Sequence, residues 1–347
     1  MLNKKEIKNC TLPELEDGIK ELGEPTFRAR QIFEWIYKKG IFEFGGMSNI
    51  SKTLRKSLQA RYTNFVPPVE TKSVSSDGTV KYLFKLQDGN FIESVLIPVT
   101  GKNTLCLSTQ VGCRFACVFC ASGSSGFVRN LSVSEIVSQA LHVRFIDKKE
   151  VNNLVFMGIG EPLDNMEPLV KALEIINDER GLTIGARRIT ISTMGLVPGI
   201  KKLADLKKQF GLSISLHAAD DALRNRLMPV NKKYPIKDVL EAAKYFFENT
   251  KRQVTFEYIL FRDLNDDPAN ADRLAQLLKS LPYPLQKVNL LLFNETLRGE
   301  FRSSDISKAE EFQQNLKKKL ISATIRRPRG RDIAAACGQL RSRLKPS

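Results

Sequence analysis

The sequence has 347 residues, enough to bury a full hydrophobic core and to form one large domain with a smaller domain attached. Hydrophobic residues make up 42% of the chain, and no apolar run is long enough to span a membrane, which argues against a membrane protein. The first residues lack the apolar core of a secretory signal, so we expect a cytoplasmic protein with free thiols. The 54 Lys and Arg residues exceed the 38 Asp and Glu residues and give a net charge of +16, which favours a nucleic acid as partner.

Residues 1–66 predict a small helical domain. Residues 11–14, Thr-Leu-Pro-Glu, have the form of a capping box with proline in the first helical turn. Residues 27–40 carry a broad apolar stripe that ends in a basic turn and a glycine, and a second short helix is expected at 51–58. Two prolines at 67–68 end this unit. Its similarity to small helical nucleic-acid modules favours a role in RNA binding.

Residues 67–99 predict a β-hairpin that leads into a main domain at 100–347. Its two apolar strands are expected at 80–86 and 91–97, with the turn sequence Asp-Gly-Asn between them. The hairpin therefore separates the helical unit from the main domain.

Short β-branched runs alternate with helical patterns throughout the main domain. The expected strands are 104–108, 153–158, 188–193, 212–218, 253–261, 287–293 and 322–326. This alternation implies an α/β fold with a parallel sheet covered by helices. About six repeats favour a partial or open (β/α)6-type barrel, although a doubly wound sheet is also compatible with the pattern. In either fold we expect the active site at the carboxyl ends of the strands.

Three cysteines, Cys113, Cys117 and Cys120, follow the pattern C-x3-C-x2-C on one short segment. Three thiolates can hold a metal but leave it one ligand short, because structural zinc sites and iron–sulfur clusters normally take four protein ligands. An iron–sulfur cluster with one iron open to an exchangeable ligand fits this pattern best. A zinc site completed by a remote Cys or His is the alternative, and a disulfide is less compatible with so few, unevenly spaced cysteines.

Polar and glycine residues follow several of the expected strands, where a parallel sheet would gather them into one pocket. Two glycines before Glu161 would let the backbone approach a ligand, and the Glu161 carboxylate could accept a hydrogen bond from an ammonium group. The residues concerned are Gly160, Glu161, Ser192, Ser215, Leu216, His217 and Asn294. Taken singly, Ser192, Ser215, His217 and Asn294 each fit a helix cap or a satisfied polar group of the core better than a ligand-binding role.

Two cysteines outside the short segment have plausible roles. Cys337 lies among small residues after the last expected strand and follows an arginine-rich stretch, which would lower its pKa and make it nucleophilic. A buried structural cysteine is the alternative. Cys106 lies on the first expected strand, where its side chain could point inward. Cys10 has no assigned role.

Together these segments resemble the RlmN/Cfr family, radical S-adenosylmethionine (SAM) methyltransferases that methylate an adenine carbon in RNA. The strongest element pairs Cys-Arg-Phe-Ala-Cys-Val-Phe-Cys with the distal Ala-Ala-Cys-Gly-Gln-Leu. The segments Met-Gly-Ile-Gly-Glu-Pro-Leu, Leu-Met-Pro-Val-Asn-Lys-Lys-Tyr and Ser-Leu-His also fit, and the resemblance covers nearly the whole chain. Near the distal cysteine the chain departs from the family, with Arg331 and Ala335 where relatives often carry acidic residues, whereas Asp332 remains.

The resemblance implies a role for each candidate residue. The three clustered cysteines would hold one 4Fe–4S cluster, and the residues at the strand ends would bind SAM, of which two molecules are used per turnover. Cys337 would take a methyl group from one SAM, and a 5′-deoxyadenosyl radical from the second would abstract hydrogen from it. The resulting methylene radical would add to adenine, Glu93 would accept the ring proton, and Cys106 would release the product by forming a disulfide with Cys337.

The family also implies substrates and partners. RlmN-type members methylate adenine C2 in 23S rRNA, and bacterial members often modify tRNA too, whereas Cfr-type members methylate C8 of the same rRNA adenine and confer antibiotic resistance. Pro162 after Glu161 favours the RlmN type. We expect a monomer that receives electrons from a protein such as flavodoxin and does not bind membranes. A non-enzymatic metal-containing RNA-binding protein and another radical SAM enzyme are the rival hypotheses.

Overall fold

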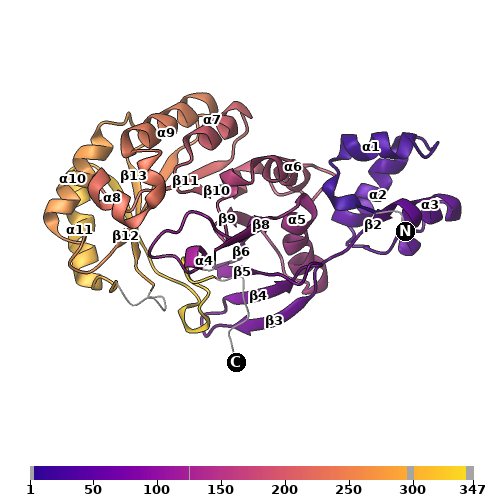
Figure 1. Ribbon diagram of the computed structural model, residues 1–347, viewed down its shortest axis with the longest axis horizontal. Coiled ribbons are helices and arrows are strands. Elements are labelled where there is room, and N and C mark those ends of the chain that lie inside the picture. The colour runs from indigo at the N-terminus through magenta and orange to yellow at the C-terminus, as the bar shows by residue number, and fades with distance from the viewer. Residues whose placement is uncertain (1–3, 125, 295–300, 341–347) are drawn as a thin grey trace.

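The structure, a computed structural model, describes residues 4–124, 126–294 and 301–340 (Figure 1). It is elongated, with a small N-terminal unit at one end and a large α/β domain beside it. In the small unit the three α-helices are α1 (Leu12–Lys20), α2 (Phe27–Tyr37) and α3 (Lys52–Arg61). The capping box at Thr11 forms as the sequence predicts, and the helix expected at 51–58 has Ser51 as its N-cap. Two short strands that were not predicted, β1 (Lys5–Glu6) and β2 (Tyr62–Thr63), pair in parallel and join the two ends of the unit.

The N-terminal unit packs against helices α5 (Val133–Leu141) and α6 (Met166–Asn177) of the large domain. The Lys171 ammonium lies 2.7 Å from the Glu14 carboxylate, and the Ser134 N–H donates to the Asn9 side chain at 2.8 Å. At Gly40 a Cβ atom would collide with the Phe145 ring, so this close approach requires glycine. Polar and steric contacts of the described residues therefore connect the two units.

One sheet of ten strands organises the described part of the large domain. Its order is β14-β13-β12-β11-β10-β9-β6-β5-β4-β3. The strands are β3 (Val69–Val74), β4 (Val80–Lys85), β5 (Phe91–Val99), β6 (Lys102–Cys106), β9 (Asn153–Phe156), β10 (Ile189–Thr193), β11 (Gly211–Ser215), β12 (Val254–Leu260), β13 (Lys287–Leu292) and β14 (Ser322–Arg326). The predicted hairpin, β4 and β5, pairs antiparallel with β6 and so extends the core sheet, and β3 adds an edge strand that the sequence did not reveal.

From β6 to β14 all strands are parallel and follow each other in chain order. Because right-handed crossovers that always step in one direction place every helix on the same face, this order defines a partial barrel and not a doubly wound sheet. The remaining α-helices are α4 (Ala121–Ser124), α7 (Val197–Asp205), α8 (Asp221–Leu227), α9 (Ile236–Thr250), α10 (Pro268–Lys279) and α11 (Ile306–Lys318). The predicted α/β partial barrel with an N-terminal helical unit and a hairpin extension is confirmed.

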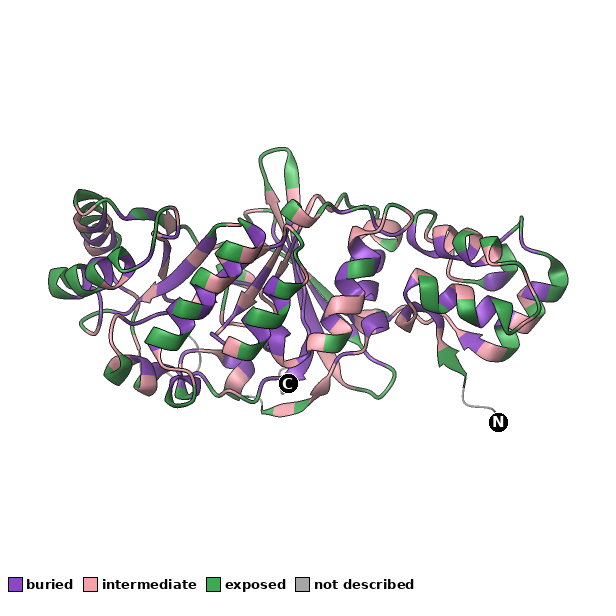
Figure 2. Ribbon diagram, turned by 90° about the horizontal axis from the view of Figure 1, so that it is seen from above, coloured by how far each residue is buried: buried purple, intermediate pink, exposed green. Residues whose placement is uncertain are grey.

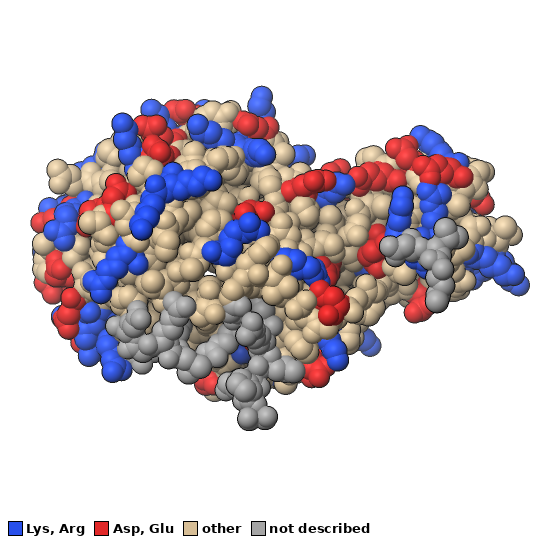
Figure 3. Space-filling model, in the orientation of Figure 1, with Lys and Arg blue, Asp and Glu red and all other residues tan. Residues whose placement is uncertain are grey.

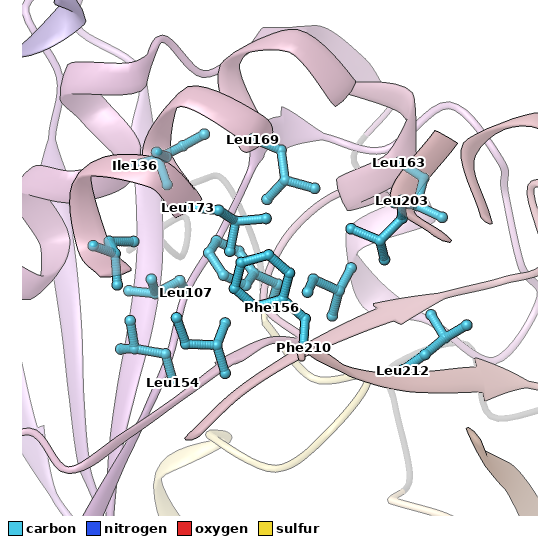
Figure 4. Packing of buried hydrophobic residues seen from close by; sticks show 14 of the residues in the cluster. Leu107, Ile136, Leu154, Phe156, Leu163, Leu169, Leu173, Leu203, Phe210 and Leu212 are labelled. Atoms are coloured by element: carbon cyan, nitrogen blue, oxygen red, sulfur yellow. The ribbon is translucent and has the colours of Figure 1, made fainter. Parts of the chain in front are cut away.

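The core lies between the sheet and its helices (Figure 4). Phe156 of β9 packs there with Leu173 of α6 and Leu203 of α7, all of them buried. Outer helix faces are exposed whereas the strands are largely buried, which explains the near-continuous apolar character of the strand sequences (Figure 2). Among the described residues no helix combines the length and apolar character needed to span a membrane.

Candidate active site

The three clustered cysteines lie on a loop that two unpredicted strands hold closed at its base. Strands β7 (Gln110–Gly112) and β8 (Phe127–Asn130) pair antiparallel, and the Cys113 N–H donates to the Gly126 carbonyl at 3.0 Å. Gly112 has φ +74°, and a Cβ atom there would collide with that carbonyl, so only glycine permits this pairing of β7 and β8. The paired strands place the loop at the carboxyl ends of the core strands.

The thiols of Cys113, Cys117 and Cys120 are free. Burial raises the pKa of Cys113 to about 12 and that of Cys117 well above its ordinary value, and the neighbouring loop cysteines raise both pKa values further. Among the described residues, no three Cys, His, Asp or Glu side chains lie close enough together to hold a single metal ion. A 4Fe–4S cluster is larger than an ion and takes cysteine thiolates at its corners, so three free, electrostatically coupled thiols on one loop fit it.

Glu161 is a buried carboxyl group just beyond β9. Its Oε2 accepts a hydrogen bond from the Met194 N–H at 2.9 Å, and its Oε1 accepts one from the Leu163 N–H at 3.1 Å. The Glu161 N–H donates to Gln110 Oε1 at 2.9 Å. Burial raises the pKa of the carboxyl to about 7 against these hydrogen bonds. Glu161 therefore joins the ends of three strands and can switch between acceptor and donor near neutral pH.

The close packing of this backbone against Gln110 requires glycine at position 160. Its φ is +100°, and a Cβ atom there would lie 2.5 Å from the Gln110 Cβ. The backbone at Gly160 can thus pass close to Gln110 of β7, whereas the approach to a ligand that the sequence suggested stays a prediction.

Ser215, Leu216 and His217 leave β11 in an unusual backbone conformation. The N–H groups of Leu216 and His217 both donate to the Glu257 carbonyl, at 3.0 and 3.2 Å, and His217 has φ +57°. The His217 Nδ1 accepts from the Ile259 N–H at 3.1 Å. Burial, and then the charge of Arg224, lower the pKa of His217 to about 3, so the ring is neutral and its Nε2 remains available as a donor.

Sequence reasoning missed Arg224 of α8. Its side chain is completely buried, and its guanidinium donates to backbone carbonyls at the ends of β10 and β11. Its neighbours in the sequence, Leu223 and Asn225, gave no signal, because an exposed arginine on an amphipathic helix has the same local sequence. Ser192 is half-buried on β10, where it pairs in register with Ser213 of β11.

The C-terminal segment crosses the ends of the strands and contacts the cysteine loop. The Ala121 N–H donates to the Gly338 carbonyl at 2.7 Å, and the Ser122 Oγ donates to the Leu340 carbonyl at 2.9 Å. Asn294, beyond β13, donates to the Cys337 carbonyl at 3.2 Å. Residues far apart in sequence thus meet at this end of the sheet.

The expected low pKa of Cys337 is wrong. The residue is exposed, yet the protein around the thiol removes enough water from it to raise its pKa to about 11. The charges of Glu257 and Cys120 act in the same direction and outweigh that of Arg326. The sequence analysis overestimated how far the arginines lower this pKa, because the sequence does not show how much protein surrounds the thiol.

Cys106, the last residue of β6, lies close to Cys337. Burial and then the Cys337 charge raise the pKa of Cys106 to about 12. Its side chain packs in an apolar cluster with Ala335 and Leu340 of the C-terminal segment. Both cysteines are free thiols in the structure, so the implied disulfide is not formed.

Glu93 lies on the same face of the sheet as Cys106, because Cys106 pairs with Val95 and alternate residues of β5 share a face. The Glu93 side chain is mostly buried and forms an ion pair of 3.1 Å with Lys81. The Lys81 ammonium also donates to the Ala334 carbonyl at 3.2 Å. One lysine therefore connects this carboxylate to the segment that carries Cys337.

Comparison with known proteins agrees with this architecture. Residues 107–275 match the radical SAM superfamily model, and residues 5–63 match the model of the ribosomal RNA large subunit methyltransferase N-terminal domain. A crystal structure of a radical SAM methyltransferase from Sphaerobacter thermophilus is 41% identical and superposes with a TM-score of 0.92, covering 98% of this chain and 100% of that one.

Curated relatives cover the chain almost completely. A probable dual-specificity RNA methyltransferase RlmN from Clostridium novyi is 46% identical over 97% of this chain and 98% of its own length. The dual-specificity RNA methyltransferase RlmN from Pelobacter propionicus is 44% identical over 99% of this chain and 98% of its own length. The fold and the cysteine loop define a SAM-dependent radical SAM enzyme. Within that class, the chain belongs to the RlmN family of RNA methyltransferases.

Proposed function

We propose that this protein transfers a methyl group from SAM to C2 of a specific adenine in 23S rRNA and of the adenine beside the tRNA anticodon. The convergence of the cysteine loop, Cys106 and Cys337 on one end of the sheet carries this proposal. The C2 carbon of adenine is electrophilic and cannot attack the methyl group of SAM directly. A protein nucleophile that carries the methyl group, and a second group that releases the product, would overcome this difficulty.

The cysteine loop and the strand ends would hold the cofactors. Cys113, Cys117 and Cys120 are assigned to the 4Fe–4S cluster, which would supply the electron that cleaves SAM. The SAM-binding residues are assigned as Gly160, Glu161, Ser192, Ser215, Leu216, His217 and Asn294. Glu161 suits the amino group of SAM, because the ionised carboxylate would gain an opposite charge in a buried site. Two molecules of SAM would be consumed per turnover.

Cys337 is the proposed methyl carrier. Its thiol pKa of about 11 means that it is protonated at neutral pH in the SAM-free protein. The positive sulfonium of SAM placed beside the sulfur would favour the thiolate that attacks the methyl group. The exposure of Cys337, on a segment that Asn294 and Ala121 hold by hydrogen bonds, would then allow the methylated sulfur to reach a base.

Glu93 and Cys106 would complete the reaction. Glu93 is assigned as the acceptor of the C2 proton, with Lys81 holding its carboxylate toward the Cys337 segment. Cys106, as a thiolate, would attack the Cys337 sulfur and form a disulfide; the broken sulfur–carbon bond would leave its electron pair on the carbon, which would take a proton to become the methyl group, and an external reductant would reopen the disulfide. The burial of Cys106 beside Cys337 supports this role, because thiols from solution are kept away from the sulfur that Cys106 would attack.

The substrate is supported by the relatives and by charge. The relatives' names specify dual-specificity RNA methyltransferases. Basic side chains lie over both the N-terminal unit and the core on the face seen in Figure 3, with acidic side chains between them. Pro162 after Glu161 favours C2 over the Cfr-type C8 product. The proposed setting is a cytoplasmic monomer reduced by a flavodoxin-like protein.

Replacing Cys106 tests this mechanism. With SAM, reductant and RNA under anaerobic conditions, Cys106→Ala should accumulate a covalent protein–RNA adduct on a denaturing gel, because nothing releases the base from Cys337. Cys337→Ala should bind SAM but form neither adduct nor product. Cys10→Ala, which changes a free cysteine of the N-terminal unit, should behave like the unaltered protein. Full methyl transfer by Cys337→Ala would refute the proposal.

A further inference from the structure

Arg224 is a buried cation whose hydrogen-bond partners are all neutral. Within the described residues its guanidinium takes part in no ion pair. Its acceptors are the carbonyls of Met194 (2.7 Å), Ser215 (3.0 Å), Leu216 (3.1 Å) and Tyr234 (3.3 Å) and the Asn231 side chain (2.6 Å). A guanidinium with 0% exposure satisfies its donors in this way but has no carboxylate in contact with its charge, and removing such an ion from water is unfavourable.

The Asp221 carboxylate, whose charge acts on Arg224, forms its hydrogen bonds with other groups. The Asp221 Oδ1 accepts from Asn231 Nδ2 at 2.8 Å and from the Ile236 N–H at 2.9 Å. Asn231 therefore stands between the acid and the guanidinium. Asn231 thus helps to fix the geometry of Arg224, while the Asp221 carboxylate stabilises the guanidinium without touching it.

The charge of Arg224 also acts on the cysteine loop. The Val118 N–H, next to Cys117, donates to the Leu227 carbonyl at 3.1 Å, and Leu227 lies one helical turn beyond Arg224 on α8. Arg224 and Cys117 are close enough for the charge of each to shift the pKa of the other, and a Cys117 thiolate stabilises the charged guanidinium more than Asp221 does. Helix α8 thus binds the loop through its backbone and faces it with a cation.

The same guanidinium also binds the two loops assigned to SAM. Met194 follows β10, and its N–H holds Glu161, while Ser215 and Leu216 end β11. The Arg224 side chain therefore connects both of these segments to helix α8, whose Leu227 carbonyl binds the cysteine loop. Its fork of donors suits this role better than an ammonium group would.

We infer that Arg224 is a positioning residue that serves as the fixed counter-charge of the cluster site and orders the SAM-binding loops around it. Three thiolates make the loaded site anionic, and a reduced cluster is more negative still. A fixed cation in a buried setting stabilises the more negative state, so Arg224 should raise the reduction potential of the bound cluster. This inference rests on the proposed assignment of the cluster to the three cysteines.

The test compares variants that separate charge from geometry. Arg224→Gln removes the charge but keeps a donor, Arg224→Lys keeps the charge but loses the fork, and Arg226→Gln removes an exposed charge from the same helix as a matched control. The full-length protein is reconstituted with iron and sulfide. Iron content, the cluster midpoint potential from an anaerobic redox titration and the SAM dissociation constant are then measured.

We expect Arg224→Gln to lower the ratio of reduced to oxidised cluster at least tenfold at the unaltered protein's midpoint, a shift of about 59 mV for one electron. Arg224→Lys and Arg226→Gln should keep the unaltered potential, whereas both Arg224 variants should bind SAM more weakly. If Arg224→Gln assembles no cluster, assembly by Arg224→Lys with an unaltered potential supports the inference in its place.

Three results would overturn the inference. These are an unaltered potential in Arg224→Gln, an equal shift in Arg224→Lys, or loss of the cluster in both variants. Each of them would show that the positive charge at position 224 does not set the potential of the cluster. In all three cases the unaltered protein still carries iron, so the proposed function stands. An unaltered protein that takes up no iron would instead overturn the proposed function together with this inference.

Discussion

Replacing Glu161 with glutamine should change how the stability of the protein depends on pH. Burial raises the pKa of this carboxyl from 4.5 to about 7 in the folded protein. The folded state therefore binds the proton more tightly than the unfolded chain. The stabilisation from this group is fully present below about pH 4.5 and is lost as the pH rises through about 7.

The size of the effect follows from the two pKa values. The full contribution is about 3 kcal/mol, and between about pH 5.5 and about pH 8 the free energy of unfolding should fall by about 2 kcal/mol through this group alone. Glutamine cannot titrate, so Glu161→Gln should lack this fall. The variant should also be destabilised by an amount that does not vary with pH, because its amide cannot accept from both the Met194 and the Leu163 N–H groups.

The assay is urea unfolding of the cluster-free, SAM-free protein and of Glu161→Gln over this pH range. The depressed pKa of His217 has the opposite effect, because its stabilisation is lost as the pH falls below 6.5, but it is common to both proteins and cancels in their difference. The variant should gain stability relative to the unaltered protein as the pH rises. Two parallel curves would refute the assignment of a raised pKa to Glu161.

Three further substitutions have defined outcomes. Gly160→Ala should destabilise the cluster-free protein by about 1–3 kcal/mol, because the new Cβ meets Gln110 at positive φ, and an unchanged melting temperature would contradict this. Asp332→Ala removes the acceptor for two hydrogen bonds from the β3–β4 turn, so trypsin should cleave faster within residues 326–331, whereas unchanged cleavage would show that the turn does not hold this segment. Cys113→Ala should lose most of the iron that the unaltered protein takes up, and full iron content would exclude Cys113 as a ligand.

The sequence predicted the elements whose pattern is strong. The last strand has the predicted bounds, 322–326, and the other core strands lie within a few residues of theirs, because buried parallel strands are nearly continuous apolar runs. Strand β3 escaped notice since it lies at the sheet edge with mostly polar, exposed side chains. Strands β7 and β8 are three and four residues long, too short for any periodicity to show.

The position of the candidate site could also be predicted, because parallel strands bring their carboxyl ends to one edge. Its electrostatics could not. The high pKa of the Cys337 thiol depends on burial and on Glu257, which is 80 residues away in sequence. The role of Arg224 depends on carbonyls from two other strands. Both effects arise from contacts between residues far apart in the sequence, so no local sequence pattern predicts them.

The central claim is methylation of adenine C2 through Cys337. The most direct test incubates the iron-reconstituted protein anaerobically with SAM, reductant and unmodified 23S RNA, digests the RNA and identifies methyladenosine by mass spectrometry against standards. We predict 2-methyladenosine from the unaltered protein and none from Cys337→Ala. A product of 8-methyladenosine, or cleavage of SAM with no methylated adenosine, would contradict the claim.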